Sequence, residues 1–274
     1  MGDFRIRFWG VRGSIPSPGP DTVRYGGNTA CIELRLGPHL LIVDAGSGIR
    51  PLGRSLLGAG PVEADILFTH THYDHVSGLP FFAPAYDPAN RFTLWEGHLG
   101  PDQTLKAVLR QLMSAPLFPV PVNLIDRSCA YRKFAPGDVL TPRPGITVRT
   151  AALNHPNGCV GYRIEHADRA VCTLFDTEHA PGTLDPAALD LARGADVLIY
   201  DANYTDAELP DHTGWGHSTW EQGCRLAKAA GVGQLLLFHH DPARDDAALD
   251  AIGRAAAAQF AEPRVAAEGL LITL

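Results

Sequence analysis

Residues 65–78 read DILFTHTHYDHVSG, and this stretch decides how we interpret the chain. Residues 65–69 include an unbroken apolar run, which is typical of a strand covered on both faces. Four side chains of metal-binding type follow within six residues: His70, His72, Asp74 and His75. Imidazole nitrogens and carboxylate oxygens are ligands that suit zinc, manganese or iron. Because four such residues follow one strand, a metal site is a better interpretation than a polar surface loop.

Three later residues also follow apolar strands. His155 comes after residues 146–152, Asp176 follows the sequence Leu-Phe, and His239 follows QLLLF. On a strand, adjacent side chains point to opposite faces, so His239 and His240 cannot both enter one site. The three positions are therefore candidates for completing the site that the first cluster begins.

The pattern H-x-H-x-D-H after an apolar strand, with these later candidates in order, resembles the metallo-β-lactamase-fold hydrolases, in particular the phosphodiesterase and ribonuclease Z branch. The resemblance covers nearly the whole chain and favours His239 over His240, although Phe175 stands where the family has a glycine. It implies two divalent metal ions, zinc first and manganese second, with a shared hydroxide as nucleophile. The implied ligands are His70, His72 and His155 for one ion, Asp74, His75 and His239 for the other, and Asp176 as the bridge.

The strand pattern fits an α/β chain folded as a four-layered αββα sandwich. One set of strands ends at the histidine cluster, and a second set, which we begin at residues 129–134, ends at His155 and Asp176. No flexible linker separates the two sets, so we expect a single domain over residues 1–274. We expect helices at residues 49–57, 76–82, 101–113, 186–193, 220–230 and 245–260, and a semi-rigid flap at residues 115–122.

Residues 214–219 read GWGHST and resemble the histidine motif of the phosphodiesterase branch. The resemblance implies that His217 meets the scissile phosphate and assists the leaving oxygen, and we count Asp74 with it among the catalytic candidates. Asp201 is the first choice for holding His217 charged, with Asp211 and His212 as alternatives.

Several neighbouring residues allow two interpretations. Asp44 either orients a metal-bound imidazole or caps the following helix, and we rank the two equally. Ser218 and Glu221 predict a capping box, and His179 is expected to be exposed in a loop. Loops at residues 154–158 and 178–181 are expected to line the cleft, whereas the Gly- and Pro-rich residues 10–20 predict a surface loop.

The net charge, the cysteines and the apolar segments indicate which kinds of partner to expect. The net charge of −7 argues against a dominant basic face, so we expect no stable nucleic-acid complex. Five scattered cysteines without a C-x-x-C pair, and no secretory or membrane-spanning segment, indicate a cytoplasmic protein without a membrane partner. The sequence neither predicts nor excludes a homodimer.

The expected substrate is a small phosphodiester, such as a cyclic nucleotide or a cyclic ribose phosphate. Bacterial ribonuclease Z enzymes carry a tRNA-binding arm between the third histidine and the bridging aspartate, but His155 and Asp176 are only 21 positions apart. The alternatives are a thiolesterase or lactonase on the same fold, ribonuclease Z-type tRNA 3′ processing and, ranked low, a metal-holding module without turnover.

Overall fold

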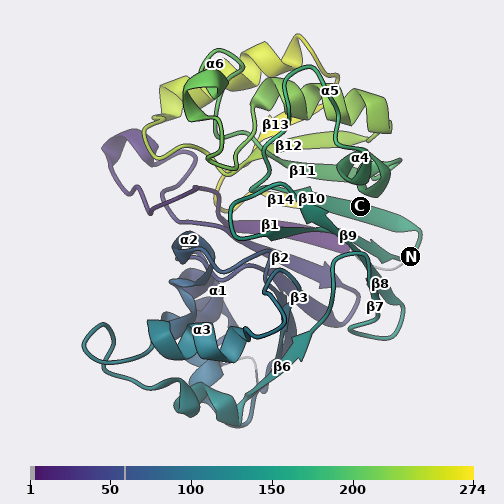
Figure 1. Cartoon of the computed structure of the whole chain (residues 1–274). Coiled ribbons are helices and arrows are strands. Elements are labelled where there is room, and N and C mark those ends of the chain that lie inside the picture. The colour runs from purple at the N-terminus through teal and green to yellow at the C-terminus, as the bar shows by residue number, and fades with distance from the viewer. Residues whose placement is uncertain (1–3, 59) are drawn as a thin grey trace.

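The computed structural model describes residues 4–58 and 60–274, in which two seven-stranded mixed sheets pack face to face between two layers of helices. Figure 1 shows α4, α5 and α6 over one sheet and α1, α2 and α3 over the other. The predicted αββα sandwich is confirmed.

The strands of the first sheet lie in the order β14 (Leu271–Thr273), β1 (Phe4–Gly10), β2 (Cys31–Leu36), β3 (His39–Val43), β4 (Glu63–Leu67), β5 (Arg91–Glu96) and β6 (Cys129–Lys133). Those of the second lie in the order β13 (Pro263–Val265), β12 (Gln234–Phe238), β11 (Val197–Asp201), β10 (Arg169–Leu174), β9 (Cys159–His166), β8 (Ile146–Leu153) and β7 (Val139–Leu140).

The helices fall into two sets by the sheet that they cover. The first set contains α1 (Ile49–Leu56), α2 (Tyr73–Val76), α3 (Leu105–Leu112) and the 3₁₀ helices η2 (Leu79–Phe81), η3 (Ala83–Tyr86) and η4 (Val122–Arg127). The second contains α4 (Pro186–Ala192), α5 (Trp220–Ala230) and α6 (Asp246–Ala257). Two further 3₁₀ helices, η1 (Pro20–Thr22) and η5 (Leu209–His212), lie in loops.

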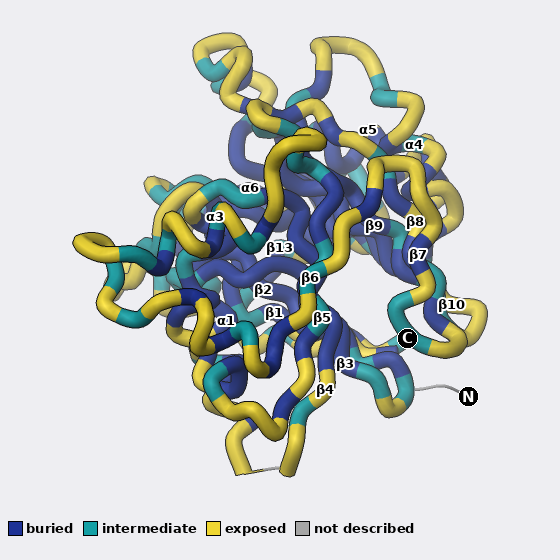
Figure 2. Tube along the Cα trace, turned by 60° about the horizontal axis from the view of Figure 1, so that its bottom comes forward, coloured by how far each residue is buried: buried dark blue, intermediate teal, exposed yellow. Residues whose placement is uncertain are grey.

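The largest core lies between the two sheets. Side chains from both sheets fill it, among them Phe8, Tyr162 and Phe238, each completely buried. β1 shows why, since its alternate residues are buried while Arg5 and Arg7 face outward. Burying one large apolar side chain contributes roughly 1.5–3 kcal/mol, so this layer gives the sandwich much of its stability. Figure 2 shows buried strands in the centre and exposed loops around them.

The sheets bring the predicted ligands together because many strands end at the same edge. β3, β4 and β5 are parallel to one another, as are β10, β11 and β12. β8 is antiparallel to β9, which is antiparallel to β10, so β8 runs in the direction of β10. Residues that directly follow these strands therefore meet at one edge of the sandwich.

The predicted grouping of residues 129–134 with the second strand set was wrong. These residues form β6, which pairs in parallel with β5 in the first sheet. α3 and η4 precede β6 and make the crossover from β5. The short apolar pattern of a strand predicts its pairing mode poorly and does not indicate which sheet it joins, because each sheet is covered by the other sheet on one face and by helices on the other.

Two local predictions also needed correction. The helix predicted at residues 76–82 is α2, which begins at Tyr73 and is followed by η2, where Pro80 supplies no N–H for continuing an α-helix. The cap of α5 is Thr219, whose side chain accepts from Gln222 N, rather than Ser218. The strands β13 and β14 after α6 were not predicted.

In the described part of the chain no helix has the length and apolarity to cross a membrane.

Asp185 caps α4 as predicted, because its side chain accepts hydrogen bonds from Ala187 N and Ala188 N. Asp185→Ala leaves these N–H groups without their partner, so we expect the free energy of unfolding to fall by about 1 kcal/mol. Urea denaturation measures it, with Asp185→Asn as the matched control that keeps an acceptor. An equal loss in both variants would contradict the capping role.

Candidate metal centre

Seven predicted ligands lie together at the edge where the strands end. Within each of two sets, all ligand atoms lie within 4.8 Å of one another. His70, His72 and His155 form what we call the first ligand group, and Asp74, His75 and His239, with Asp176 beside them, form the second ligand group. The two groups adjoin, and all seven side chains come from the ends of β4, β8, β10 and β12 or from α2.

The carboxylate of Asp176 lies between the two groups. Its Oδ1 is 3.9 Å from His70 Nε2 and 3.8 Å from His155 Nε2. Its Oδ2 is 3.3 Å from His75 Nε2 and 3.2 Å from His239 Nε2. One oxygen faces each group, which is the geometry required of a bridging carboxylate.

Asp74 closes the second ligand group from the side of α2. Its Oδ2 is 3.1 Å from His75 Nε2 and 3.2 Å from His239 Nε2. The same oxygen accepts a hydrogen bond from Ser14 N at 2.7 Å. Asp74 is thus held by backbone from a distant loop while it faces the two imidazoles.

Asp44 orients imidazoles rather than capping α1, whose N-cap is Gly48. The completely buried Asp44 carboxylate accepts from His75 Nδ1 at 2.7 Å and from both N and Oγ1 of Thr69. Thr69 Oγ1 in turn lies 3.1 Å from His70 Nδ1, from which it accepts, since its own proton goes to Asp44. Both imidazoles therefore carry their proton on Nδ1 and turn Nε2 toward the centre.

His155 is fixed in the same way by a different partner. Its Nδ1 donates to the carbonyl oxygen of Gly216 at 2.7 Å, which leaves Nε2 facing His72 Nδ1 at 2.9 Å. Burial lowers the pKa of both histidines, so each ring favours the neutral form that binds a metal ion.

Unpartnered buried atoms show that these residues fit divalent ions. His70 Nε2 and Asp176 Oδ2 are buried and make no hydrogen bond. Burial and the nearby His75 hold the pKa of His70 well below its usual range. Burial raises the pKa of Asp176, but the imidazoles of His239 and His75 outweigh it and hold that pKa well below its usual range. A neutral imidazole and an ionised carboxylate, each with a buried atom that makes no hydrogen bond, are the forms in which these groups ligate.

His217 lies beside the ligand groups and is paired with Asp201. Its Nδ1 donates to Asp201 Oδ2 at 3.1 Å and lies 3.9 Å from Asp176 Oδ1. Burial lowers the pKa of His217, but the charge of Asp201 and the hydrogen bond to it outweigh burial and raise the pKa to about 9. Of the three partners considered from the sequence, the structure places Asp201 here. His212 instead donates to Glu208 O.

Two other histidines are placed away from the ligand atoms. His240 is buried on the opposite side and pairs through Nε2 with the carbonyl oxygen of Ala266 at 2.8 Å. His179 is buried, which corrects the expected exposure, and its Nδ1 lies 2.8 Å from Ser218 Oγ. Neither contributes to a ligand group within the described residues.

Comparisons with known proteins identify the family of the chain. Residues 39–240 match the family model described as beta-lactamase superfamily domain. The chain belongs to this family. A curated relative, the ribonuclease Z of Mycobacterium sp. (strain KMS), is 29% identical over 254 residues, covering 82% of this chain and 81% of the relative. The chain is therefore a metallo-β-lactamase-fold hydrolase, and the fold implies divalent metals.

Solved structures share the fold at low identity. The metallo-beta-lactamase fold protein YhfI from Bacillus subtilis aligns over 100% of both chains with a TM-score of 0.75 and 19% identity. A diphosphatase from the PhnP family aligns over 99% of this chain and 97% of that chain, with a TM-score of 0.72 and 17% identity. Likeness at these identities extends to the fold alone.

The sequence did not reveal that the loop after β1 contributes to the site. It predicted a surface loop over residues 10–20, but Arg12 is completely buried and Ser14 N holds Asp74. A Cβ added at Gly13 would lie 2.4 Å from two ring atoms of His239, so only glycine leaves room for that ring. The signal available was the Arg-Gly-Ser sequence directly after a strand, which is too common to indicate a site.

Gly216 is a second position where the backbone approaches a ligand. Its φ is +84°, and an added Cβ would lie 2.2 Å from His155 Nδ1. The glycine therefore serves both the left-handed conformation and the hydrogen bond that its carbonyl makes to His155.

We expect this protein to bind about two divalent ions per chain. The metal content should be much lower in Asp176→Ala, because a bridging carboxylate serves both ions. Elemental analysis of purified protein measures the content. Asp190→Ala, at an exposed aspartate on α4, is the matched control and should keep both ions. A single ion per chain that is retained in Asp176→Ala would falsify the dinuclear assignment.

Proposed function

We propose that this hydrolase is a dinuclear phosphodiesterase that acts on a small phosphodiester such as a cyclic nucleotide or a cyclic ribose phosphate. The observation that carries the proposal is His217, held by the buried Asp201 at 3.1 Å next to Asp176. Divalent ions at the two ligand groups would supply a nucleophile from water at neutral pH and offset the charge of the phosphate.

His217 supplies what phosphodiester cleavage needs beyond metal binding. Against the effect of burial, the Asp201 carboxylate raises the pKa of His217 to about 9, so at neutral pH both ring nitrogens are protonated. Nδ1 then donates to Asp201, and Nε2 carries a proton that can be given to a leaving oxygen. An alkoxide is a poor leaving group at neutral pH unless it is protonated, whereas a thiolate, with a thiol pKa of about 8.5, leaves more readily. A thiolesterase would have less use for this residue.

Asp201 also couples the proton donor to the bridging ligand. The same oxygen that accepts from His217 accepts from Asp176 N at 3.0 Å. The other oxygen accepts from Asn203 N at 3.1 Å. One buried carboxylate thus fixes the positions of both His217 and the Asp176 backbone, so that the donor is held at a constant distance from the ligand groups.

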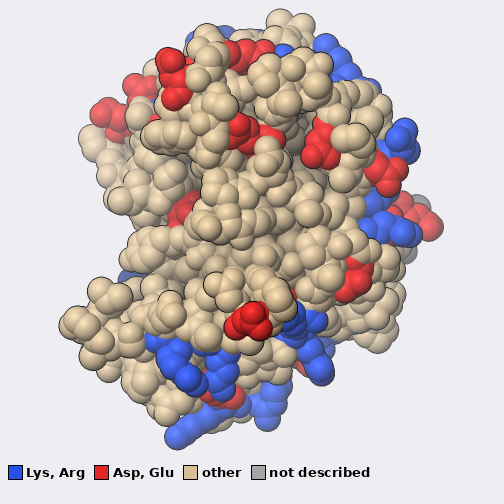
Figure 3. All heavy atoms as spheres, in the orientation of Figure 1, with Lys and Arg blue, Asp and Glu red and all other residues tan. Residues whose placement is uncertain are grey.

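A small substrate is supported by the connection between His155 and Asp176. Between the short connections 156–158 and Phe175, the segment is the hairpin of β9 and β10 with its two-residue turn Ala167 and Asp168, which leaves no room for an inserted arm. Figure 3 shows Lys and Arg gathered at the lower end of the face in view, while its central region is mostly uncharged. A continuous basic surface for a polynucleotide is absent from this face of the described residues.

Processing of tRNA is the second candidate, because the relative in Mycobacterium is named ribonuclease Z. The proposal predicts that the metal-loaded protein cleaves a cyclic nucleotide and bis-p-nitrophenyl phosphate in preference to a thiolester and a lactone. It also predicts that a tRNA with a 3′ trailer stays intact. Parallel incubations followed by chromatography and gel electrophoresis measure these activities.

Preferred turnover of the thiolester or the lactone would move the chain to those hydrolases. Specific cleavage of the tRNA precursor at its discriminator base would favour the ribonuclease Z candidate and contradict the small-substrate proposal.

His217→Ala should lower kcat on a cyclic nucleotide by about 10²- to 10⁴-fold while the metal content stays unchanged, because a positioned general acid contributes that much. The loss should be smaller on a p-nitrophenyl ester, whose leaving group needs little protonation. His166→Ala is the matched control, since this histidine lies at the end of β9 away from the ligand groups, where its ring pairs with Gly145 O. Wild-type turnover of the variant on a cyclic nucleotide, or a loss that merely follows lost metal, would contradict the role.

A further inference from the structure

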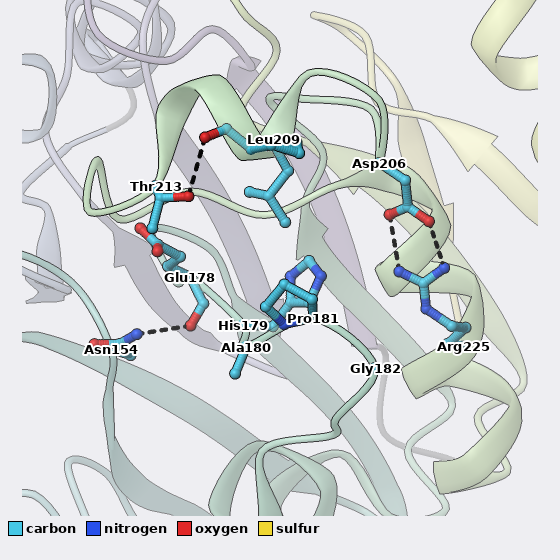
Figure 4. A pocket seen from close by; sticks show the side chains of 11 residues that line it. Asn154, Glu178, His179, Ala180, Pro181, Gly182, Asp206, Leu209, Thr213 and Arg225 are labelled. Carbon is cyan, nitrogen blue, oxygen red and sulfur yellow. Dashed lines mark hydrogen bonds and ion pairs between the residues drawn. The ribbon is translucent and has the colours of Figure 1, made fainter.

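A pocket of about 630 Å³ lies beside the metal centre, within the range of small-molecule sites. Figure 4 shows it between the loop that carries Glu178 to Gly182 and the segment from Leu209 to Thr213, with Asp206 and Arg225 at one side. Asn154 completes the lining. None of these residues belongs to a ligand group.

Hydrogen bonds and the backbone connect the lining residues of this pocket to the residues of the metal centre. The Glu178 carboxylate accepts from Gly214 N and from Gly216 N at 2.8 Å, and Gly216 O accepts from His155 Nδ1. Asn154 precedes His155, and consecutive Cα atoms lie about 3.8 Å apart. The pocket and the ligand groups therefore share the same loops.

The charges of the lining argue against a second phosphate in the pocket. Arg225 is the one Lys or Arg among its described lining residues, and its two terminal nitrogens already donate to both oxygens of Asp206, at 2.7 and 2.9 Å. The remaining charge is the carboxylate of Glu178. An anion would meet no uncompensated cation and one negative group, so the fitting occupant is uncharged.

The chemistry of the walls fits an organic ring with a polar edge. Pro181, Leu209 and Pro210 supply apolar surface, and His179 and Asn154 supply hydrogen-bonding groups. Apolar walls with a few fixed polar groups are typical of sites that bind and orient an organic ring. A nucleobase has this combination, whereas a bare ribose is polar on every side.

We propose that this pocket binds the nucleobase of a phosphodiester whose phosphate lies at the ligand groups. The inference rests on the proposed phosphodiesterase function and extends it, because it selects base-carrying substrates over base-free cyclic ribose phosphates. Asn154, Glu178 and His179 then belong to the same substrate site as the metal ligands.

The test compares a nucleoside 2′,3′-cyclic phosphate with the 2,3-cyclic phosphate of 1-O-methylribose, which lacks the base. Ala180→Trp and Thr213→Trp fill the pocket from two exposed loop positions. Ala255→Trp, at an exposed position on α6, is the matched control. We expect wild type and control to favour the base-carrying substrate in kcat/KM by on the order of 10-fold or more, and both pocket variants to lose most of this preference.

Equilibrium binding of adenosine, followed by saturation-transfer NMR, gives a readout that needs no turnover. Adenosine should bind wild type and Ala255→Trp, and bind both pocket variants much more weakly. A wild-type preference near one, a preference unchanged in both variants, or equal adenosine binding to all four proteins would overturn the pocket assignment. Failure of the protein to cleave either phosphodiester would overturn the proposed function, while adenosine binding would still decide the pocket.

Discussion

The buried carboxylate of Asp176, between two groups of imidazoles, is the constraint on which the arrangement of the site depends. Taking an ionised carboxylate out of water costs several kcal/mol unless opposite charge or hydrogen bonds compensate it. Here His75 and His239 lie within 3.3 Å of one oxygen, while the other faces His70 and His155. Divalent ions in the same space would supply the compensation that the protein leaves incomplete, since one oxygen of this buried carboxylate makes no hydrogen bond.

The chain accepts local strain in order to bring these groups together. Among the described residues, seven that are not glycine have positive φ. Four of them, Asp44, Asp176, His239 and Ser14, are ligands or hold a ligand by a hydrogen bond. A fifth, Asn157, lies 3.2 Å through its Nδ2 from His72 Nε2. A non-glycine residue in this region costs of order 1–3 kcal/mol and persists when its surroundings determine it. Asp44 directly follows β3, His239 directly follows β12, and Asp176 follows β10 after one residue. The chain therefore turns sharply at the end of each of these strands and directs the side chain toward the shared edge.

Much of the metal centre was predictable from the sequence, because four of its seven ligands lie within residues 70–75, shortly after the apolar run of β4. Other parts were not predictable, for physical reasons. Ser14 acts through its backbone N–H, which every residue except proline has, so no residue type signals it. The partner of His217 depended on the register of β11, which brings Asp201 beside it while Asp211 stays elsewhere in the described fold. The pocket beside the metal centre is formed by loops, whose packing follows no periodic sequence pattern.

The central claim is that Asp176 joins two ions, one in each ligand group, at the edge where the two sheets end. Anomalous diffraction from crystals of the metal-loaded protein, recorded at the absorption edges of zinc and manganese, tests it most directly. The account predicts two peaks, one within each ligand group, with an oxygen of Asp176 in contact with each. A single peak, or two peaks of which only one touches Asp176, would contradict it.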